Sequence, residues 1–306
     1  MGRYLLRRLL WIPLVLFLLV TLAFFLIKAA PGGPFSMEKE TPPKIRENME
    51  RKWHLDEPVW KQYLYYLGDL ARFDLGHSFR QQNRTVREVI AEQFPNSVIL
   101  GVAALAIALA VGLTAGIVAA IRQNTVFDYS SMTVAMVGLA TPTFVSGPLL
   151  VMLFAMYLGW FRVTGWDDFP RDLILPAITL SLPFAARIAR LTRAGMLEIV
   201  NQDYIKTARS KGLSETVVIV RHALKGALLP VVSYLGPATA DILVGGLVVE
   251  RIFDVPGIGR EFVVSAINRD YTLVLGLVLL DGVLLVFMNL LVDVVYGFLD
   301  PRIRYD

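Results

Sequence analysis

Six long apolar stretches constrain the fold of this chain more than any other feature of its sequence. A helix that crosses the hydrocarbon core of a bilayer needs about 20 mostly apolar residues. Only helices and closed barrels satisfy their backbone polar groups in lipid, and these stretches are longer than barrel strands and do not alternate. The sequence therefore predicts an all-α membrane protein with six transmembrane helices. The stretches are Leu9–Ile27, Ser97–Ile121, Ser131–Trp160, Leu173–Ile188, Ala227–Val249 and Leu273–Leu299.

The composition excludes several other classes of protein. Of the 306 residues 55% are hydrophobic and 18% are charged, whereas soluble domains average about 45–50% and about 25%. The chain has no cysteine and three histidines, which excludes disulfides, thiolate metal sites and a thiol nucleophile. It contains neither HExxH nor GxSxG, so we expect no metal site and no enzyme of those classes. An intramembrane enzyme of another kind, a secondary transporter and a membrane scaffold are functions to weigh for such a chain.

Basic residues gather in segments that would lie on one side of the membrane. The segment 187–225 holds eight basic and three acidic residues, and Arg3, Arg7 and Arg8 precede the first apolar stretch. Lys and Arg concentrate on the cytoplasmic side of membrane proteins, so we expect both termini and this segment to be cytoplasmic. The same asymmetry explains the net charge of +4 without a nucleic-acid partner.

The first stretch also has the basic flank of a secretory signal peptide. Its apolar part exceeds the 7–15 residues of a signal-peptide core, so we expect a retained helix within residues 1–30, with cleavage near Ala29 as the alternative. Residues 31–96 are too polar for lipid and form the predicted extracytoplasmic region. A helical stretch at Val59–Phe73 is rich in aromatic residues, which favours packing in the protein or at the membrane interface, with contact with an outside partner as the alternative. Residues 97–306 form the predicted transmembrane domain.

Prolines inside the apolar stretches indicate bends in the helices, and acidic residues inside them indicate a polar environment. Paired prolines occur in the third, fourth and fifth stretches, where each proline removes a helical hydrogen bond and favours a bend. Charged residues inside a bilayer face a cavity, a partner or the interface. We therefore expect Asp241, with Thr239 and Pro142, to line a substrate pathway, whereas Asp293 is expected to be solvated near the cytoplasmic boundary.

The segment between the fourth and fifth stretches predicts a helix, a glycine corner and a second helix. Residues 202–211 have helical composition, Gly212 suits the left-handed residue that ends a helix, and Ser214 suits the N-cap of the next one. Tyr204, Ile205 and Ala208 share one face of the first helix. Such a face is predicted to dock in a groove of another protein, with a helix lying on the lipid surface as the alternative.

Here the sequence resembles a known family. The stretch DYIKTARSKGL at 203–213, followed by RHAL and LLP, resembles the cytoplasmic motif of binding-protein-dependent ABC importer permeases, in the oligopeptide and dipeptide branch. Aligned on Gly212, the family's Glu-Ala-Ala triplet falls on Lys206, Thr207 and Ala208, of which Ala208 alone matches. Further segments similar to that branch are LDEP at 55–58, DLGHS at 74–78, PGIG at 256–259 and NRDY at 268–271.

The resemblance implies a type I importer permease in the cytoplasmic membrane of a bacterium or archaeon. Such a subunit works with a second homologous permease, two cytoplasmic ATPase subunits and an extracytoplasmic peptide-binding protein. The substrate would be an oligopeptide or dipeptide, with nickel, glutathione or an oligosaccharide as alternatives. The chain lacks GxxxxGK[ST], so ATP and Mg²⁺ are expected on the partner subunits and no cofactor in this chain.

The resemblance also assigns candidate sites. Residues 202–213 would form the coupling helix that contacts an ATPase, and the Pro256–Gly259 turn would be part of an external gate or a dock for the binding protein. The coupling residues are Tyr204, Ile205, Lys206, Thr207, Ala208, Arg209, Lys211, Gly212 and Leu213, and the external ones are Pro256, Gly257, Gly259, Arg269 and Asp270.

Overall fold

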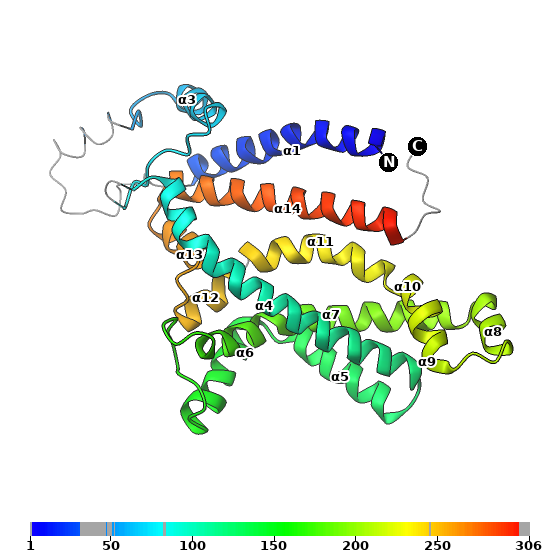
Figure 1. The fold of residues 1–306 in the computed structure, drawn as a ribbon. Coiled ribbons are helices and arrows are strands. Elements are labelled where there is room, and N and C mark those ends of the chain that lie inside the picture. Colours follow the sequence, from blue (N-terminus) through cyan, green and yellow to red (C-terminus); the bar gives the residue numbers. More distant parts are fainter. Residues whose placement is uncertain are drawn as a thin grey trace.

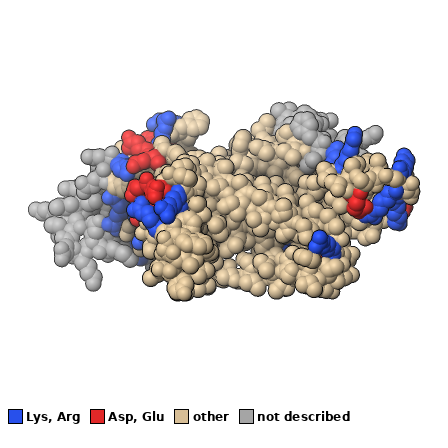
Figure 2. Space-filling view, turned by 60° about the horizontal axis from the view of Figure 1, so that its bottom comes forward, with Lys and Arg blue, Asp and Glu red and all other residues tan. Residues whose placement is uncertain are grey.

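The computed structural model is all-helical in the part of the chain that it describes, which comprises residues 2–30, 47, 51, 53–81, 84–244 and 246–299. Within the predicted extracytoplasmic region, residues 31–46, 48–50, 52, 82 and 83 lie outside these ranges. Within the described chain, five helices are long and apolar enough to cross a membrane, and a bent helix pair can form a sixth span. On the face drawn in Figure 2, most charged side chains gather at the two ends of the molecule, with an uncharged band between them. The predicted all-α membrane fold is confirmed, and the cytoplasmic location of both termini stays a prediction.

The long helices run side by side across this band (Figure 1). The start of α1 and the end of α14 lie at the same end of the bundle as α8, which we call the elbow end; the opposite end is the clasp end. Spans are formed by α1 (Gly2–Ala29), α4 (Val86–Ile121), α7 (Arg171–Val200), α11 (Leu229–Val244) with α12 (Leu247–Phe253), and α14 (Tyr271–Leu299). Shorter elements near the two ends of the bundle include α8 (Asp203–Ser210), α9 (Glu215–Val217), η2 (Val218–Ala223), α10 (Leu224–Ala227) and α13 (Ile258–Ile267).

Helix α4 begins eleven residues before the apolar stretch that predicted it. Thr85 caps its N-terminus: the Thr85 hydroxyl accepts from the backbone of Glu88 at 3.2 Å, and the Glu88 carboxylate accepts from the backbone of Thr85 at 2.9 Å. This reciprocal pair is a capping box. The polar first turns hid the helix from a search for apolar residues, so the predicted domain boundary between residues 96 and 97 falls inside α4.

The third predicted span is not one helix. It consists of α5 (Val126–Ala140), followed after a break by α6 (Thr143–Leu150) and the π-helical segment η1 (Val151–Tyr157). The two parts are bent by 107°. Pro142, which has no backbone N–H to continue α5, stands at the break as the N-cap of α6. The paired prolines thus predicted a bend, but the bend is so sharp that α5 and α6 are two separate helices.

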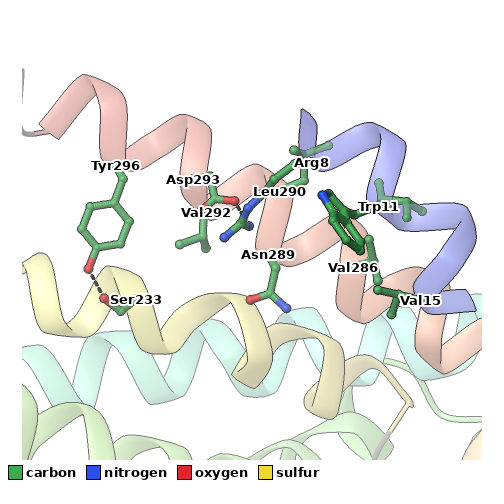
Figure 3. A pocket seen from close by; sticks show the side chains of 11 residues that line it. Arg8, Trp11, Val15, Ser233, Val286, Asn289, Leu290, Val292, Asp293 and Tyr296 are labelled. Carbon is green, nitrogen blue, oxygen red and sulfur yellow. Dashed lines mark hydrogen bonds and ion pairs between the residues drawn. The ribbon is translucent and has the colours of Figure 1, made fainter. Parts of the chain in front are cut away.

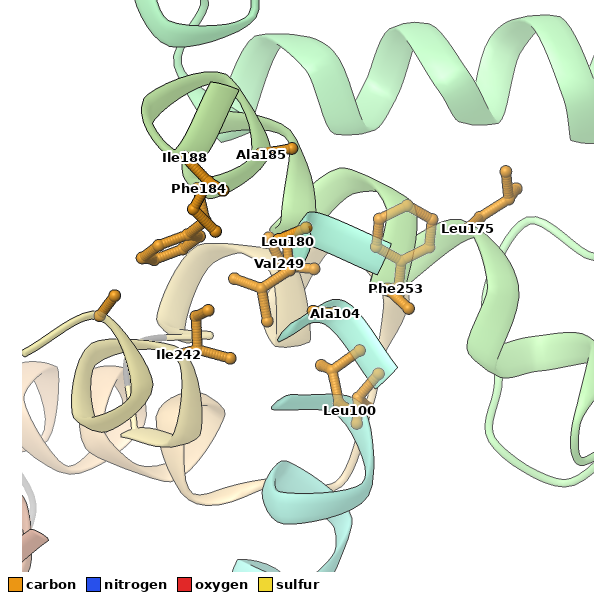
Figure 4. Packing of buried hydrophobic residues seen from close by; sticks show 14 of the residues in the cluster. Leu100, Ala104, Leu175, Leu180, Phe184, Ala185, Ile188, Ile242, Val249 and Phe253 are labelled. Carbon is orange, nitrogen blue, oxygen red and sulfur yellow. The ribbon is translucent and has the colours of Figure 1, made fainter. Parts of the chain in front are cut away.

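The most extensive helix packing joins α4 to α7. A Cβ on Gly112 would lie 2.7 Å from the carbonyl oxygen of Ala185, and one on Gly116 would lie 2.5 Å from that of Ala189. The GxxxG pair therefore lets two backbones approach, as small residues do between membrane helices. Figure 4 shows the adjoining apolar core, in which Leu100 and Ala104 of α4, Leu180 and Phe184 of α7, Ile242 of α11, and Val249 and Phe253 of α12 lie close together.

Helix α3 (Val59–Ala71) packs against α1 near the clasp end. The hydroxyls of Tyr63 and Thr21 are 2.7 Å apart, and Tyr66 stacks on Phe24 with ring centroids 5.7 Å apart. Burial in this contact raises the pKa of Tyr66 to about 12. The aromatic stretch therefore packs within the chain, which was one of the two arrangements favoured by its sequence.

Candidate coupling elbow and clasp

The elbow, residues 201–230, turns the chain back between α7 and α11. Ile205 and Ala208 of α8 are buried within this chain, with Ile205 0% exposed, against Met196 of α7 and Val218 of η2. The prediction that these two residues offer an apolar face to a partner is wrong. Burying apolar area inside the chain stabilises the corner itself, and only Tyr204 of the predicted face is exposed, at 49%.

The corner between α8 and α9 follows the sequence prediction. Gly212 has φ +76°, the left-handed conformation that glycine adopts without steric cost. Arg209 and Glu215 bridge the corner with nitrogen–oxygen distances of 2.6 and 3.1 Å. This hydrogen-bonded pair raises the pKa of Arg209 and lowers the pKa of Glu215. Ser214 occupies the N-cap position of α9, but its side chain makes no capping hydrogen bond.

The outward surface of the elbow is polar and mostly basic. Lys206 forms a local pair with Asp203 at 3.0 Å, and the exposed Lys211 and Leu213 flank Gly212. In Figure 2 blue side chains gather at this end of the molecule. The predicted coupling residues thus divide into two buried anchors and an exposed set. The exposed set is Tyr204, Lys206, Thr207, Arg209, Lys211, Gly212 and Leu213.

A buried ion pair supports the elbow from the membrane side. Arg193 of α7 donates to both carboxylate oxygens of Asp128 at the start of α5, at 2.6 and 2.8 Å. Asp128 is buried, and the backbone of Asn124 donates to it at 3.0 Å. The pair ties the end of α7 to α5. Sequence reasoning missed it because the two residues are 65 positions apart and each resembles an ordinary loop charge.

The proposed pathway residues lie on two elements. Thr239 and Asp241 are on α11, where the Thr239 hydroxyl donates to its own helix at 2.6 Å, and Pro142 lies at the α5–α6 break. Asp241 is an exposed residue of α11, and Asp281 lies on the neighbouring α14. The structure therefore places Asp241 and Asp281 on adjacent spans. Among the described residues, no hydrogen bond links Pro142 to either of them.

Asp293 is paired rather than merely solvated. It forms an ion pair with Arg8 of α1, beside a cavity of about 630 Å³ between α1, α11 and α14 (Figure 3). In the same cavity Tyr296 of α14 hydrogen-bonds to Ser233 of α11. Arg8 is 285 residues away from Asp293 in the sequence, so the residues around Asp293 give no sign of this partner. Pairing of this kind keeps both charges stable near apolar helices.

At the opposite end, a buried carboxylate organises the Pro256–Gly259 turn. Glu250 of α12 is 1% exposed and accepts from the Ser97 hydroxyl at 2.7 Å and from the backbone of Arg260 at 3.0 Å. The first N–H groups of a helix have no acceptor within that helix, so a carboxylate at the N-terminus of α13 is well placed to accept from them. A Cβ on Gly257 would lie 2.4 Å from the Glu250 carboxylate. The glycines of this turn are therefore explained by close approach to Glu250.

A second buried carboxylate joins two motifs that are far apart in the sequence. Asp270 is 1% exposed, accepts from the Ser78 hydroxyl, and accepts from the backbones of Phe79 and Arg80 at 3.1 and 3.3 Å. It also caps α14 by accepting from the backbone of Leu273 at 3.3 Å. The DLGHS and NRDY motifs therefore meet at one carboxylate.

We call Glu250 and Asp270, together with their donors, the clasp. Its position corrects the prediction for the external residues: Gly257, Gly259 and Asp270 are buried and cannot contact a partner directly, whereas Pro256 is exposed and Arg269 is partly exposed. Glu250 and Ser97 were not singled out from the sequence because each lies at the edge of an apolar stretch, where a polar residue is expected to be solvated. Among the described residues, no group of three or more His, Asp or Glu side chains is placed to hold a metal ion.

Comparison with known proteins identifies the family. Residues 112–305 match the family model of the binding-protein-dependent transport system inner membrane component, and residues 1–101 match the model of its N-terminal region. The oligopeptide transport system permease proteins OppB of Escherichia coli K12 and Haemophilus influenzae are 47% and 45% identical, over 100% of both chains. The dipeptide transport system permease protein DppB of Bacillus subtilis is 41% identical over 99% of this chain and 98% of that protein.

Solved structures agree in fold. The inward-facing MetNI methionine ABC transporter aligns with a TM-score of 0.56 at 13% identity, covering 70% of this chain and 97% of the matched chain. An amino acid ABC transporter aligns with a TM-score of 0.51 at 16% identity, covering 71% and 95%. The full-length match to the relatives and the helical fold point to the same conclusion: this chain belongs to the family of inner-membrane components of binding-protein-dependent transport systems.

Proposed function

We propose that this chain is one of two homologous permease subunits of an ATP-driven importer for oligopeptides or dipeptides. Its partners would be a second permease, two cytoplasmic ATPase subunits and an extracytoplasmic peptide-binding protein. The substrate class rests on relatives that are named as oligopeptide and dipeptide permeases and are 41–47% identical over nearly the whole chain. Nickel, glutathione and oligosaccharide importers are the alternatives within this type of transporter.

The observation that carries the proposal is the construction of the elbow. Helix α8 presents polar and basic side chains outward while Ile205 and Ala208 fix it to the rest of the chain. A short helix fixed in this way moves together with its support when a partner pushes it. The elbow end would face the cytoplasm, where its basic surface would lie in a groove of an ATPase subunit.

The packing gives this movement a route into the membrane. Met196 of α7 contacts the buried side of α8, and α7 is fixed to α4 through Gly112 and Gly116. The Asp128–Arg193 pair adds α5 to the same unit. Closure of the ATPase subunits would therefore move α4, α5 and α7 together. ATP and Mg²⁺ would be bound by the partner subunits, since this chain carries no phosphate-binding loop motif.

The substrate pathway would run along α11 and α14, past Asp241 and Thr239 and the bend at Pro142. The clasp would hold the turn at Pro256 and the start of α14 in one arrangement at the extracytoplasmic end. Carboxylates inside a membrane protein face a cavity, a partner or water, which fits a pathway that opens between this chain and a second permease.

A reconstituted complex tests the proposal. Tyr204→Glu introduces a charge on the exposed side of α8, and Gly212→Pro forbids the left-handed corner. Both variants are expected to insert and assemble, with peptide uptake per ATP hydrolysed reduced at least about tenfold. Asp167→Asn, on an exposed loop far from the elbow, serves as the matched control. Normal peptide uptake in both elbow variants would contradict the coupling role of the elbow. Uptake of nickel or an oligosaccharide in place of peptide would contradict the proposed substrate class.

A further inference from the structure

Helix α3 carries large apolar side chains on the side that does not contact α1. None of its residues is buried, and Trp60 and Leu64 are more than half exposed. Phe73, two residues past its end, is 90% exposed and has φ +59°. A residue other than glycine rarely adopts this conformation, and here it belongs to a large aromatic side chain that stays exposed. Exposed apolar surface of this kind marks a contact with something outside the chain.

The contacts of α3 fix its depth relative to the membrane spans. Tyr63 hydrogen-bonds to Thr21, which lies eight residues before the clasp end of α1 at Ala29. At 1.5 Å per residue this is about 12 Å along the helix. Near the same end, Lys28 donates a hydrogen bond to Gln62. Helix α3 therefore descends from the end of α1 toward the middle of the uncharged band.

Beneath α3 lies a cavity of about 410 Å³ whose lining is entirely apolar. It is bounded by the C-terminal half of α3 and by apolar positions in the middle of two membrane spans. An apolar cavity of this size is unfavourable for water, which needs polar partners. The lining residues are Pro13, Leu16, Phe17 and Val20 of α1, Leu67, Leu70 and Ala71 of α3, Phe73, and Leu279 and Val283 of α14.

We infer that this cavity is a binding site for the acyl chain of a phospholipid in the leaflet at the clasp end, with α3 lying in that leaflet above it. Phe17 of α1 lines the cavity and is itself 46% exposed, and its neighbours Leu14 and Leu18 are exposed as well. That surface belongs to a helix long and apolar enough to cross the bilayer, so its outward side would face lipid acyl chains. Apolar side chains and an acyl chain exclude water together.

The chain is well suited to a labelling test because it contains no cysteine. Nitroxide spin labels are attached to Phe73→Cys, with Leu70→Cys as a second site should the first variant fail to assemble, in the full complex in phospholipid nanodiscs. Asp56→Cys, exposed just before α3, is the matched control. Power saturation with oxygen, which partitions into lipid, and with a water-soluble nickel chelate reports what each label contacts.

Contact with lipid predicts that labels at positions 70 and 73 are relaxed by oxygen at least about fivefold more than by the nickel chelate, with the opposite preference at position 56. A preference for the chelate at positions 70 and 73 would place the cavity in water and overturn the inference. Protection from both reagents would mean that a protein helix, such as one of a second permease, fills the cavity, and would overturn it equally.

A filling variant gives a second readout. Ala71→Phe adds a ring at the cavity wall, and native mass spectrometry of the complex is expected to show at least one fewer retained phospholipid than the unchanged chain. Gly68→Ala, at a position with no atom within 4 Å of the added carbon, is the control and is expected to retain the full number. An unchanged lipid count in Ala71→Phe would contradict the site.

Discussion

The two ends of the molecule use charge in opposite ways. At the elbow, the Arg209–Glu215 and Lys206–Asp203 pairs lie on the surface, where ion pairs contribute little and exchange readily with a partner. At the clasp, Glu250 and Asp270 are 1% exposed and surrounded by hydrogen-bond donors, so their loss would leave buried donors without partners. The comparison teaches that the elbow keeps its charges available for contact, whereas the clasp uses buried carboxylates as hydrogen-bond acceptors that fix backbone geometry.

The largest effect on stability is expected at Asp128, which is a buried charge at the elbow end. Asp128 is buried, and Arg193→Ala removes its partner, which in buried pairs costs about 3–5 kcal/mol. We expect a clear fall in the melting temperature of the purified complex. Arg190→Ala, one turn away on α7 and exposed, should change it little. Equal melting temperatures for the two variants would mean that the pair does not support the elbow.

Removal of the Glu250 carboxylate is the next largest expected change. In Glu250→Leu the Ser97 hydroxyl and the N–H group of Arg260 lose their acceptor, at about 1–3 kcal/mol for each unsatisfied group. Glu250→Gln keeps an acceptor and should be milder. Thermal unfolding in nanodiscs checks this order, and a Gln variant as unstable as the Leu variant would indicate that the charge rather than the hydrogen bonds holds the turn.

Adding a single methyl group is expected to have opposite effects on stability at the clasp and on the open surface. In Gly257→Ala the new carbon meets the Glu250 carboxylate at 2.4 Å, and overpacking of this kind costs about 1–3 kcal/mol. In Gly68→Ala no atom lies within 4 Å, and alanine in a helix is favoured over glycine by about 0.5–1 kcal/mol. Melting temperatures of the two variants should therefore move in opposite directions, and parallel shifts would contradict the close approach.

The smallest effect belongs to the elbow corner. The Arg209 guanidinium lowers the pKa of Glu215 below its usual value of 4.5, so the pair's stabilisation is present above about pH 4.5 and is lost as the pH falls through the lowered value. Exposure limits the contribution to under about 1 kcal/mol. Glu215→Gln should remove this part of the acid dependence of unfolding while leaving the melting temperature at pH 7 nearly unchanged. A large fall in the melting temperature at pH 7 would contradict this and would show that the Arg209–Glu215 pair contributes strongly to stability.

Local features were predictable from the sequence, and contacts between distant segments were not. The spans, the helix at 203–210 and the left-handed Gly212 follow from apolar length, helix propensity and the special conformation of glycine. The face of α8 was misassigned because periodicity tells which residues share a face but not whether this chain or a partner covers it. Ile205 and Ala208 look like docking residues until Met196 is seen against them.

The missed residues have a common cause. Asp270 and Ser78 are 192 positions apart, and Ser97 and Glu250 are 153 apart, so nothing in either neighbourhood indicates the partner. Pro142 is the intermediate case, because a proline in an apolar stretch indicates a bend but not its size. A buried carboxylate and a solvated one look alike in a single sequence.

Labelling of Lys206→Cys with a membrane-impermeant maleimide tests the account most directly, because the chain has no other cysteine. The account predicts no labelling in intact cells, strong labelling in inverted vesicles stripped of ATPase subunits, and loss of that labelling once the subunits are added back. Labelling in intact cells, or labelling that the ATPase subunits leave unchanged, would contradict it.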